Sequence, residues 1–327
     1  MVVVAVAGGS SGLGLTIVQA LKVQGKHEVL ILSRKVRRYS KFASNISVAH
    51  YKQENTELGK RLGALVVAVD YRNAKSIELA LEANNVETVI CTINSQDDIE
   101  PEQNLILAAG RSPITRRIIP SIFAGFTYPI RYPDSSHVAK AKSEAIKAVK
   151  KTSLEYTAIY NGIFLDYYGA PHLKSNIPPW PLFVDILHES AAVPGSGDDL
   201  VVFTHSTDIA KFVVLSLDLP EWPEETYILG EKLTWHEFIR LAEDAKGSKF
   251  NVIHDSEADL RAGRVSILPS YGKMFQLPEA DIRALLSTAG MWFVNRELDL
   301  NPSHALNNDF PEIKPMKVKD FLESSWK

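Results

Sequence analysis

The chain has 327 residues, 45% of them hydrophobic and 23% charged, and a formal net charge of −3. This composition is that of a globular protein long enough for one large α/β domain, or for a dinucleotide-binding domain with a smaller lobe. The small negative charge gives no field that would attract nucleic acid or an anionic membrane. No stretch reaches the roughly 20 apolar residues of a membrane span. A single cysteine, Cys91, allows no intrachain disulfide, so we expect a cytoplasmic protein without a nucleic-acid or membrane partner.

Apolar, β-branched runs alternate with helical patterns through the first 160 residues. The predicted strands are 2–7, 29–32, 64–69, 88–93, a fifth that ends at 117–120, and 154–160. The predicted helices are 15–22, 75–83, 105–109 and 138–150. Because right-handed crossovers join strand–helix units of this length, we predict an α/β fold with a doubly wound parallel Rossmann sheet.

The pattern changes after residue 160. Prolines gather at 176–181 and a Gly/Asp cluster follows at 194–199, whereas residues 200–217 resemble a strand and helix that return to the first domain. Thr234 and Glu237 fit a capping box for a helix that runs to about residue 245. We therefore predict a dinucleotide-binding domain at 1–160 with the return segment 200–217, and a smaller C-terminal α+β substrate lobe at 161–327.

A glycine-rich loop follows the first strand at once and leads into a helix. Gly8 suits a tight turn, Gly12 a close approach of backbone to a diphosphate, and Gly14 close packing of helix against strand. A diphosphate is stabilised at a helix N-terminus by free N–H groups and the helix dipole. We expect the cofactor to contact the whole loop, which consists of Gly8, Gly9, Ser10, Ser11, Gly12, Leu13 and Gly14.

The second strand ends in Ser33, Arg34 and Lys35. A site selective for NAD would place an acid there for the ribose 2′-hydroxyl, and none is present. Arg34 can pair with a 2′-phosphate, with Ser33 or Lys35 adding to it, so NADPH/NADP⁺ is the predicted cofactor. The alternative is an ordinary solvent-facing basic turn.

Two further segments reach the carboxyl edge of the predicted sheet. Asp70 and Tyr71 follow the third strand, where Asp70 either accepts from the adenine amino group or starts a turn. Thr92, Ile93 and Asn94 end the fourth strand at the edge where ligands bind. We expect all five residues to contact the cofactor.

These residues resemble the NmrA-like family of atypical short-chain dehydrogenase/reductases, which includes isoflavone reductase-like enzymes, and the fungal branch most of all. The resemblance covers essentially the whole chain and includes the glycine loop, Val69-Asp70-Tyr71, Ile119-Pro120-Ser121, Leu154-Glu155-Tyr156-Thr157, Asn161-Gly162-Ile163-Phe164, Pro194-Gly195-Ser196-Gly197 and Thr207-Asp208-Ile209-Ala210. It implies an NADP-binding Rossmann domain, a C-terminal substrate lobe and a cleft between them.

The resemblance also assigns a catalytic residue. Family reductases place their proposed acid/base on the helix before the sixth strand, and the matching position is Lys142. Such a lysine can bind nicotinamide ribose hydroxyls and relay a proton, and burial can lower its pKa toward that task. The alternative is one more surface lysine among several, with Lys140 as the second choice for the catalytic position.

Two departures from the family stand out. Ile122 replaces the acid of the family's Pro-Ser-Glu-Phe-Gly segment, which predicts an apolar wall and puts ordinary reductase chemistry in question. Val138 lies where a Tyr-x-x-x-Lys pair would need tyrosine. Tyr71 and Lys75 have that spacing but follow the third strand, and we interpret them as a coincidental match.

Aromatic residues in loops and at strand ends suit a flat, apolar substrate; the alternative for each is ordinary packing. The predicted substrate-binding residues are Ile122, Phe123, Tyr128, Phe164, Tyr168 and Trp180, and no metal is expected. The leading hypothesis is an NADPH-dependent reductase of a C=N, C=C or C=O bond in an aromatic or alkaloid-like molecule of fungal secondary metabolism, acting as a monomer or homodimer. The alternatives are a cyclase or isomerase, with reduction coupled to ring closure, and an NADP-sensing regulator without catalysis.

Overall fold

The computed structural model describes residues 1–34, 57–94, 98–275 and 277–327. In these ranges the chain forms two compact units. The first consists of Met1–Phe123, Pro129–Ile159 and Val213–Thr226, and the second of Ala124–Tyr128, Tyr160–Phe212 and Tyr227–Lys327. The segment 200–217 is divided, since residues 200–212 belong to the second unit and residues 213–217 to the first. None of the helices in the described ranges is long and apolar enough to cross a membrane.

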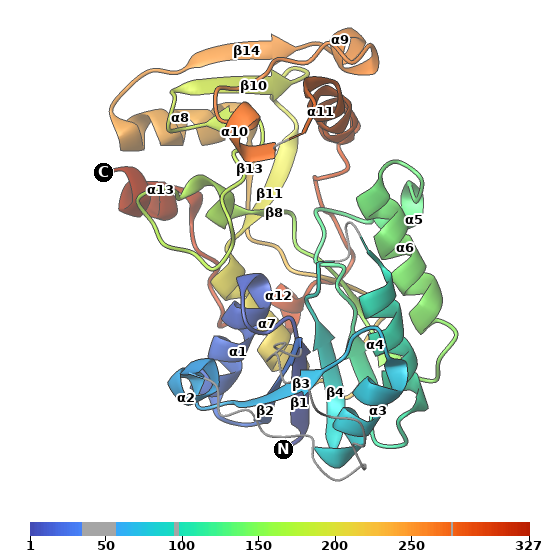
Figure 1. Cartoon of the computed structure of the whole chain (residues 1–327). Coiled ribbons are helices and arrows are strands. Elements are labelled where there is room, and N and C mark those ends of the chain that lie inside the picture. The colour runs from blue at the N-terminus through green and yellow to red at the C-terminus, as the bar shows by residue number, and fades with distance from the viewer. Residues whose placement is uncertain (35–56, 95–97, 276) are drawn as a thin grey trace, which may run out of the picture. The chain divides into compact units, whose positions relative to one another are not determined.

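The first unit contains a six-stranded parallel sheet with the order β3-β2-β1-β4-β5-β6 (Figure 1). Its strands are β1 Val3–Ala7, β2 Glu28–Arg34, β3 Leu65–Val69, β4 Val86–Cys91, β5 Arg117–Ile119 and β6 Glu155–Tyr156. The strand order reverses at β1 and β4, and ligands of open α/β sheets bind at the carboxyl ends of the strands at such a point. The predicted doubly wound Rossmann sheet is confirmed.

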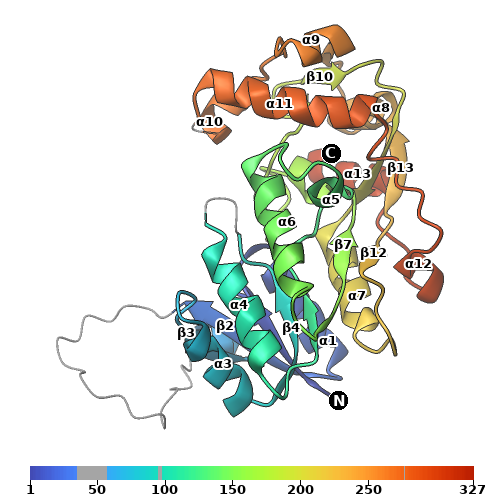
Figure 2. The same ribbon diagram turned by 90° about the vertical axis from the view of Figure 1, so that its right-hand side faces the viewer.

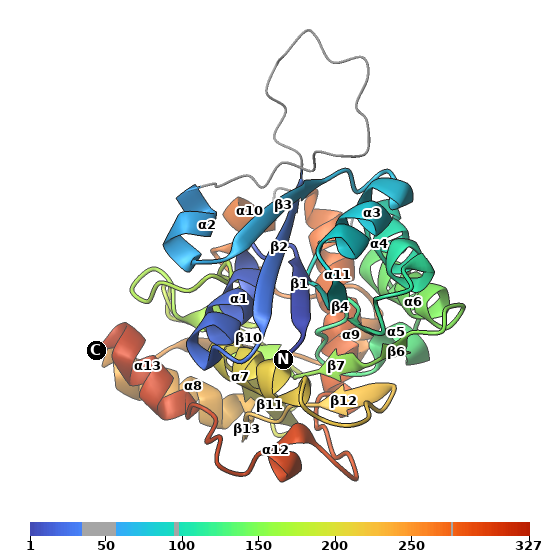
Figure 3. The ribbon, with the colours of Figure 1, turned by 90° about the horizontal axis from the view of Figure 1, so that it is seen from below.

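Helices cover both faces of this sheet, as a parallel sheet requires. Figure 3 shows α1 and α2 on one face and α3, α4 and α6 on the other. These helices are α1 Gly12–Gln24, α2 Glu57–Leu62, α3 Ala74–Ala83, α4 Glu100–Arg111 and α6 His137–Val149. The short helix α5, Tyr128–Arg131, precedes α6, and α7, Ser206–Ser216, spans the point where the chain passes from the second unit to the first.

The sixth strand is shorter than predicted. Residues 155–156 pair with β5, whereas β7, Ala158–Tyr160, pairs with β12, Glu225–Tyr227, in a separate two-stranded sheet. Thr157 lies between them, buried, with its hydroxyl 2.6 Å from that of Thr226. The apolar run 154–160 therefore serves two sheets, which its hydrophobicity alone could not reveal.

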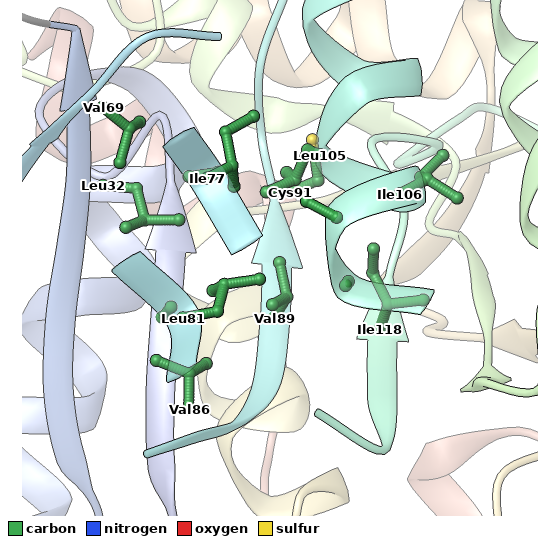
Figure 4. Close-up of a cluster of buried hydrophobic side chains, with 14 of the residues drawn as sticks. Leu32, Val69, Ile77, Leu81, Val86, Val89, Cys91, Leu105, Ile106 and Ile118 are labelled. Carbon is green, nitrogen blue, oxygen red and sulfur yellow. The ribbon is translucent and has the colours of Figure 1, made fainter. Parts of the chain in front are cut away.

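Between the sheet and helices α3 and α4 lies a core of aliphatic side chains (Figure 4). Val89 of β4 is fully buried there, among Ile77 and Leu81 of α3 and Leu105 of α4. Cys91 belongs to the same cluster as a free thiol, and burial raises its pKa well above the ordinary value. Cys91 is therefore packed as one of the apolar side chains of this core.

The second unit has mixed α+β structure. One sheet has the order β14-β10-β9 and another β13-β11-β8, each with one parallel and one antiparallel pair. The strands are β8 Ile163–Phe164, β9 Val184–Asp185, β10 Ser190–Pro194, β11 Leu200–Thr204, β13 Glu231–Thr234 and β14 Asn251–Asp255. The helices are the 3₁₀ helix η1 Leu165–Tyr168, α8 Trp235–Lys246, α9 Glu257–Arg261, α10 Tyr271–Phe275, α11 Glu279–Val294, α12 Leu306–Asp309 and α13 Val318–Trp326.

The predicted capping box at the start of α8 is present. The Thr234 hydroxyl accepts the Glu237 N–H at 3.1 Å, and the Glu237 carboxylate accepts the Thr234 N–H at 2.9 Å. At the other end, Gly247 adopts a left-handed conformation with φ of 74° and closes the helix. Local turn chemistry thus fixed both ends of this helix within a residue or two of the prediction.

Candidate functional site

The glycine loop joins β1 to α1 at the carboxyl edge of the sheet. Gly8 and Gly12 have φ of +82° and +55°, the left-handed region that favours glycine. At Gly14 a Cβ atom would lie 2.3 Å from the Thr92 Oγ1 atom and 2.5 Å from the Gly8 carbonyl oxygen. Contacts therefore require glycine at Gly14, and the backbone conformation favours glycine at Gly8 and Gly12.

Helix α1 begins inside this loop, and its first turn suits an anion. Ser11 is the N-cap residue, but its side chain accepts no hydrogen bond from the first-turn N–H groups. No acidic residue lies in that turn. The positive end of the helix dipole is therefore not neutralised by the first turn itself, as a diphosphate site requires.

Thr92 connects the loop to the neighbouring strand. Its backbone N–H and its hydroxyl both donate to the Ala7 carbonyl oxygen, at 2.8 and 2.9 Å. The same hydroxyl limits the space beside Gly8 and Gly14 to a hydrogen atom. The end of β4 is thus packed directly against the glycine loop.

The residues predicted to contact the adenosine end of the cofactor differ in exposure and in hydrogen bonding. Arg34, the last residue of β2, is exposed, and Lys35 lies outside the described residues. The Ser33 hydroxyl donates at 3.4 Å to the Arg34 carbonyl oxygen, a long contact that leaves its orientation loosely fixed. Asp70 accepts the Arg72 N–H at 3.0 Å, so its carboxylate does start a turn. We retain Ser33 and Arg34 as proposed 2′-phosphate contacts.

The hydroxyl group of Tyr71 is used in a hydrogen bond within the protein. The ring is buried, and the hydroxyl donates to the Leu32 carbonyl oxygen at 3.0 Å, which ties β2 to the turn after β3. Burial raises the Tyr71 pKa far above its ordinary value. Lys75 is paired with Glu78. Neither partner of this Tyr-x-x-x-Lys spacing is placed for catalysis, which agrees with the interpretation from the sequence.

Lys142 projects from α6 toward the end of β5. Its Nζ atom donates to the carbonyl oxygens of Ser121 and Ile122, both at 2.7 Å. The side chain is partly exposed, but burial of the amine lowers its pKa to about 8, against the opposing effect of Glu102 and Cys91. Lys140, the second choice, is exposed on the same helix.

A small cavity of about 120 Å³ lies beside this amine. It is lined by residues from the ends of β4 and β5 and from α6, namely Thr92, Ile93, Asn94, Ser121, Val138, Ala141 and Lys142. Four residues that the sequence analysis assigned to the site from separate segments, Thr92, Ile93, Asn94 and Lys142, therefore meet at one place.

Two residues beside the Lys142 amine, Ser121 and Glu102, were not among the predicted site residues. Ser121 donates its hydroxyl to the Ile93 carbonyl oxygen at 2.9 Å, and its N–H donates to the Glu102 carboxylate at 2.7 Å. Glu102 is buried on the apolar face of α4, three and four residues before Leu105 and Ile106. An acid on an otherwise apolar helix face is a signal in the sequence that could have identified Glu102.

The side chain of Ile122 does not line the site as predicted. It is fully buried, and it is the Ile122 carbonyl group that contacts Lys142. The predicted apolar wall at this position is therefore wrong, because the chain direction after β5 turns the backbone toward the amine and the side chain into the protein. Phe123, the next residue, is partly exposed.

The other aromatic residues predicted to bind substrate lie in the second unit, where each packs against other side chains of that unit. Tyr128 stacks on Trp292, with ring centroids 5.1 Å apart. Phe164 and Trp180 each pack on Tyr167, at 5.6 and 5.4 Å. Tyr168 is buried and donates its hydroxyl to the Leu182 carbonyl oxygen at 2.9 Å. Packing therefore occupies much of the surface of these rings, and Trp292 was not predicted.

The second unit also contains a Ser/His/Asp constellation in the wall of a cavity of about 180 Å³, to which Asp185 and Ser270 contribute. The His188 Nδ1 atom lies 3.0 Å from the Asp185 carboxylate and 3.2 Å from the Ser270 hydroxyl. A catalytic triad needs its acid and its serine on opposite ring nitrogens. Here both share one nitrogen, so the arrangement is not that of a hydrolase. Among the described residues, no group of three or more His, Cys, Asp or Glu side chains is placed to hold a metal.

The chain is similar to known proteins along most of its length. The model of the NmrA-like family matches residues 2–280. The chain is 32% identical to "Oxidoreductase BOA1" of Botryotinia fuckeliana over 96% of each chain, and 30% identical to "Oxidoreductase swnN" of Metarhizium robertsii over 100% of this chain and 98% of that one. The solved structure "AtPrR2 with NADP+ and (+)pinoresinol" shares the fold with a TM-score of 0.73 at 20% identity, over 98% of each chain.

Proposed function

This chain is an oxidoreductase of the NmrA-like family, and on that premise we propose that it reduces an aromatic or alkaloid-like small molecule with NADPH in fungal secondary metabolism. The bond reduced is C=N, C=C or C=O. The observation that carries the proposal is the Lys142 amine, held by two carbonyl groups at the sheet edge that also bears the glycine loop.

The residues present fit a bound NADPH. The glycine loop has no space for a side chain at Gly8 or Gly14, the first turn of α1 carries no acid, and Arg34 is exposed at the end of β2. Gly8–Gly14 would hold the diphosphate and Arg34 the 2′-phosphate. When bound, NADPH supplies the hydride for the reduction.

Lys142 supplies the proton. A protonated amine has three N–H groups, and two of them donate to the Ser121 and Ile122 carbonyl oxygens. The remaining tetrahedral position carries either the third proton or, after its loss, the lone pair. Because the pKa is about 8, the amine is mostly protonated at neutral pH and exchanges that proton readily. Two fixed carbonyls therefore aim one position of the nitrogen at a reacting atom.

The alternatives from the sequence receive less support. The cyclase hypothesis rested on Ile122 and on the aromatic lining; the Ile122 side chain is fully buried, and the aromatic rings pack on one another. A regulator that only senses NADP has no need of an amine whose pKa burial lowers to about 8. Neither alternative has an observation of its own in its favour.

The experiment is calorimetry with NADPH, NADP⁺ and NADH, followed by NADPH oxidation assays on imines, enones and quinones. We expect tight binding of both NADP forms, weak binding of NADH, and turnover with at least one substrate class. Tight NADPH binding with no turnover across the panel would overturn the reductase proposal. A clear preference for NADH would overturn the cofactor assignment.

A further inference from the structure

Next to the proposed site, the mechanism leaves the buried carboxylate of Glu102 without a role. It is the third residue of α4, where a negative charge is stabilised by the N-terminal end of the helix dipole. Only 2% of the residue is exposed. Buried carboxylates are rare unless they are paired or hydrogen-bonded, so this one calls for a role.

Glu102 is hydrogen-bonded to Ser121, the residue whose carbonyl oxygen binds the Lys142 amine. Its Oε1 atom accepts the Ser121 N–H at 2.7 Å, while the Ser121 hydroxyl donates to the Ile93 carbonyl oxygen at 2.9 Å. The carbonyl of the same serine accepts from the Lys142 amine at 2.7 Å. Ser121 is thereby held from α4 and from the end of β4, which restrains the position of its carbonyl oxygen.

Helices α4 and α6 lie side by side in the first unit (Figure 2). Because Glu102 is on α4 and Lys142 is on α6, the charge of the Glu102 carboxylate also acts on the Lys142 amine. Glu102 of α4 and, to a smaller extent, Cys91 of β4 favour the protonated amine against burial. The pKa of the buried Cys91 thiol lies well above its ordinary value, so near neutral pH the negative charge that acts on the amine is that of Glu102.

We propose that Glu102 is the positioning residue of the Lys142 acid/base: it fixes the carbonyl that binds the amine and supplies the negative charge that favours its protonated form. The inference rests on the proposed function, in which Lys142 donates a proton. Glu102 contacts no reacting atom; it acts on Lys142 through Ser121 and through its charge.

Two substitutions separate these effects. Glu102→Gln keeps an oxygen that can accept the Ser121 N–H but removes the charge, whereas Glu102→Ala removes both. Without the charge, burial lowers the pKa of Lys142 further, by about one unit or more, as is usual on removal of an opposite charge at close range. Glu78→Gln is the matched control, because Glu78 is also a buried acid on a helix of the first unit but pairs with Lys75.

The first measurement needs no activity. We expect Glu102→Gln to lower Tm at about pH 6 to 7, where Lys142 is protonated, and to lower it much less above about pH 9, where the amine is neutral. In a Lys142→Met background the effect of Glu102→Gln should lose this pH dependence. A Tm loss that is the same at every pH, or the same in both backgrounds, would overturn the proposal.

The second measurement uses any substrate that the wild type turns over. Glu102→Gln should shift the alkaline fall of kcat to lower pH by about one unit, with the NADPH affinity unchanged. Glu102→Ala should lower kcat further, because the Ser121 carbonyl is no longer fixed. Unchanged pH profiles in both variants, equal to that of Glu78→Gln, would reject the inference while leaving the reductase intact. A wild type without turnover would instead reject the proposed function, and the Tm series would still decide the role of Glu102.

Discussion

Two polar clusters, one in each unit, contain residue types that enzymes use, and only one of them is arranged for chemistry. In the first unit the Lys142 amine donates twice to backbone carbonyls and keeps one position of its nitrogen for a further partner. In the second unit Asp185 and Ser270 converge on the same nitrogen of His188. The residue types in a cluster are therefore enough to suggest a catalytic site. Whether the cluster can act depends on which of its atoms stay available once the hydrogen bonds within the protein are formed.

The largest expected effect comes from the lysine of the first cluster. Lys142→Met should lower kcat by about 10² to 10⁴, the usual contribution of a positioned acid or base, because no other side chain replaces the proton donor. NADPH affinity, measured by calorimetry, should change little. Lys140→Met is the control, since Lys140 is exposed on the same helix. Equal kcat values for Lys142→Met and Lys140→Met would show that Lys142 has no catalytic role.

The pH profile of the wild type sharpens the same contrast. The reaction needs the protonated amine, so kcat should fall as the pH rises through about 8, the pKa to which burial lowers Lys142. Above that pH the fall approaches about tenfold per pH unit, whereas an ordinary lysine would begin to lose its proton only near pH 10.4. Rates constant up to about pH 10 would show that the amine is not the proton donor.

Arg34 tests whether the same unit binds the phosphorylated cofactor. Arg34→Ala should weaken NADPH binding by about 10 to 100-fold, the equivalent of one charge-assisted hydrogen bond to a phosphate, with NADH binding unaffected. Arg72→Ala is the control, because Arg72 is paired with Asp98 and Glu100. Equal losses for NADPH and NADH would mean that Arg34 has no role in recognising the 2′-phosphate.

The smallest effect is expected in the second cluster. Ser270→Ala removes the hydroxyl but leaves Asp185 with its hydrogen bonds from the His188 ring and the backbone of residue 270, so reductase kcat should stay within about twofold. Neither protein should hydrolyse activated esters through this serine. Ester hydrolysis by the wild type that disappears in Ser270→Ala would contradict the geometric argument and make the two clusters equivalent.

Much of the first unit follows from local sequence. The alternation of apolar runs and helical patterns predicts the parallel sheet, and the glycine spacing predicts the loop that Gly8, Gly12 and Gly14 form. The capping box at Thr234 also forms as predicted. The capping box depends on residues close in sequence, whereas the sheet and the loop are visible as repeated patterns, the alternation of elements and the spacing of glycines.

The sequence by itself therefore determined the fold class and the glycine loop, and its resemblance to a known family indicated the candidate lysine. Only the tertiary structure decided which atoms surround that lysine, because Glu102, Ser121 and Lys142 are brought together from three segments by sheet order and helix packing. It also decided that Ile122 presents its carbonyl rather than its side chain, and that the Tyr71 hydroxyl is used within the protein. A hydrogen bond between distant segments depends on their register and spacing, and no local pattern of residues encodes either quantity.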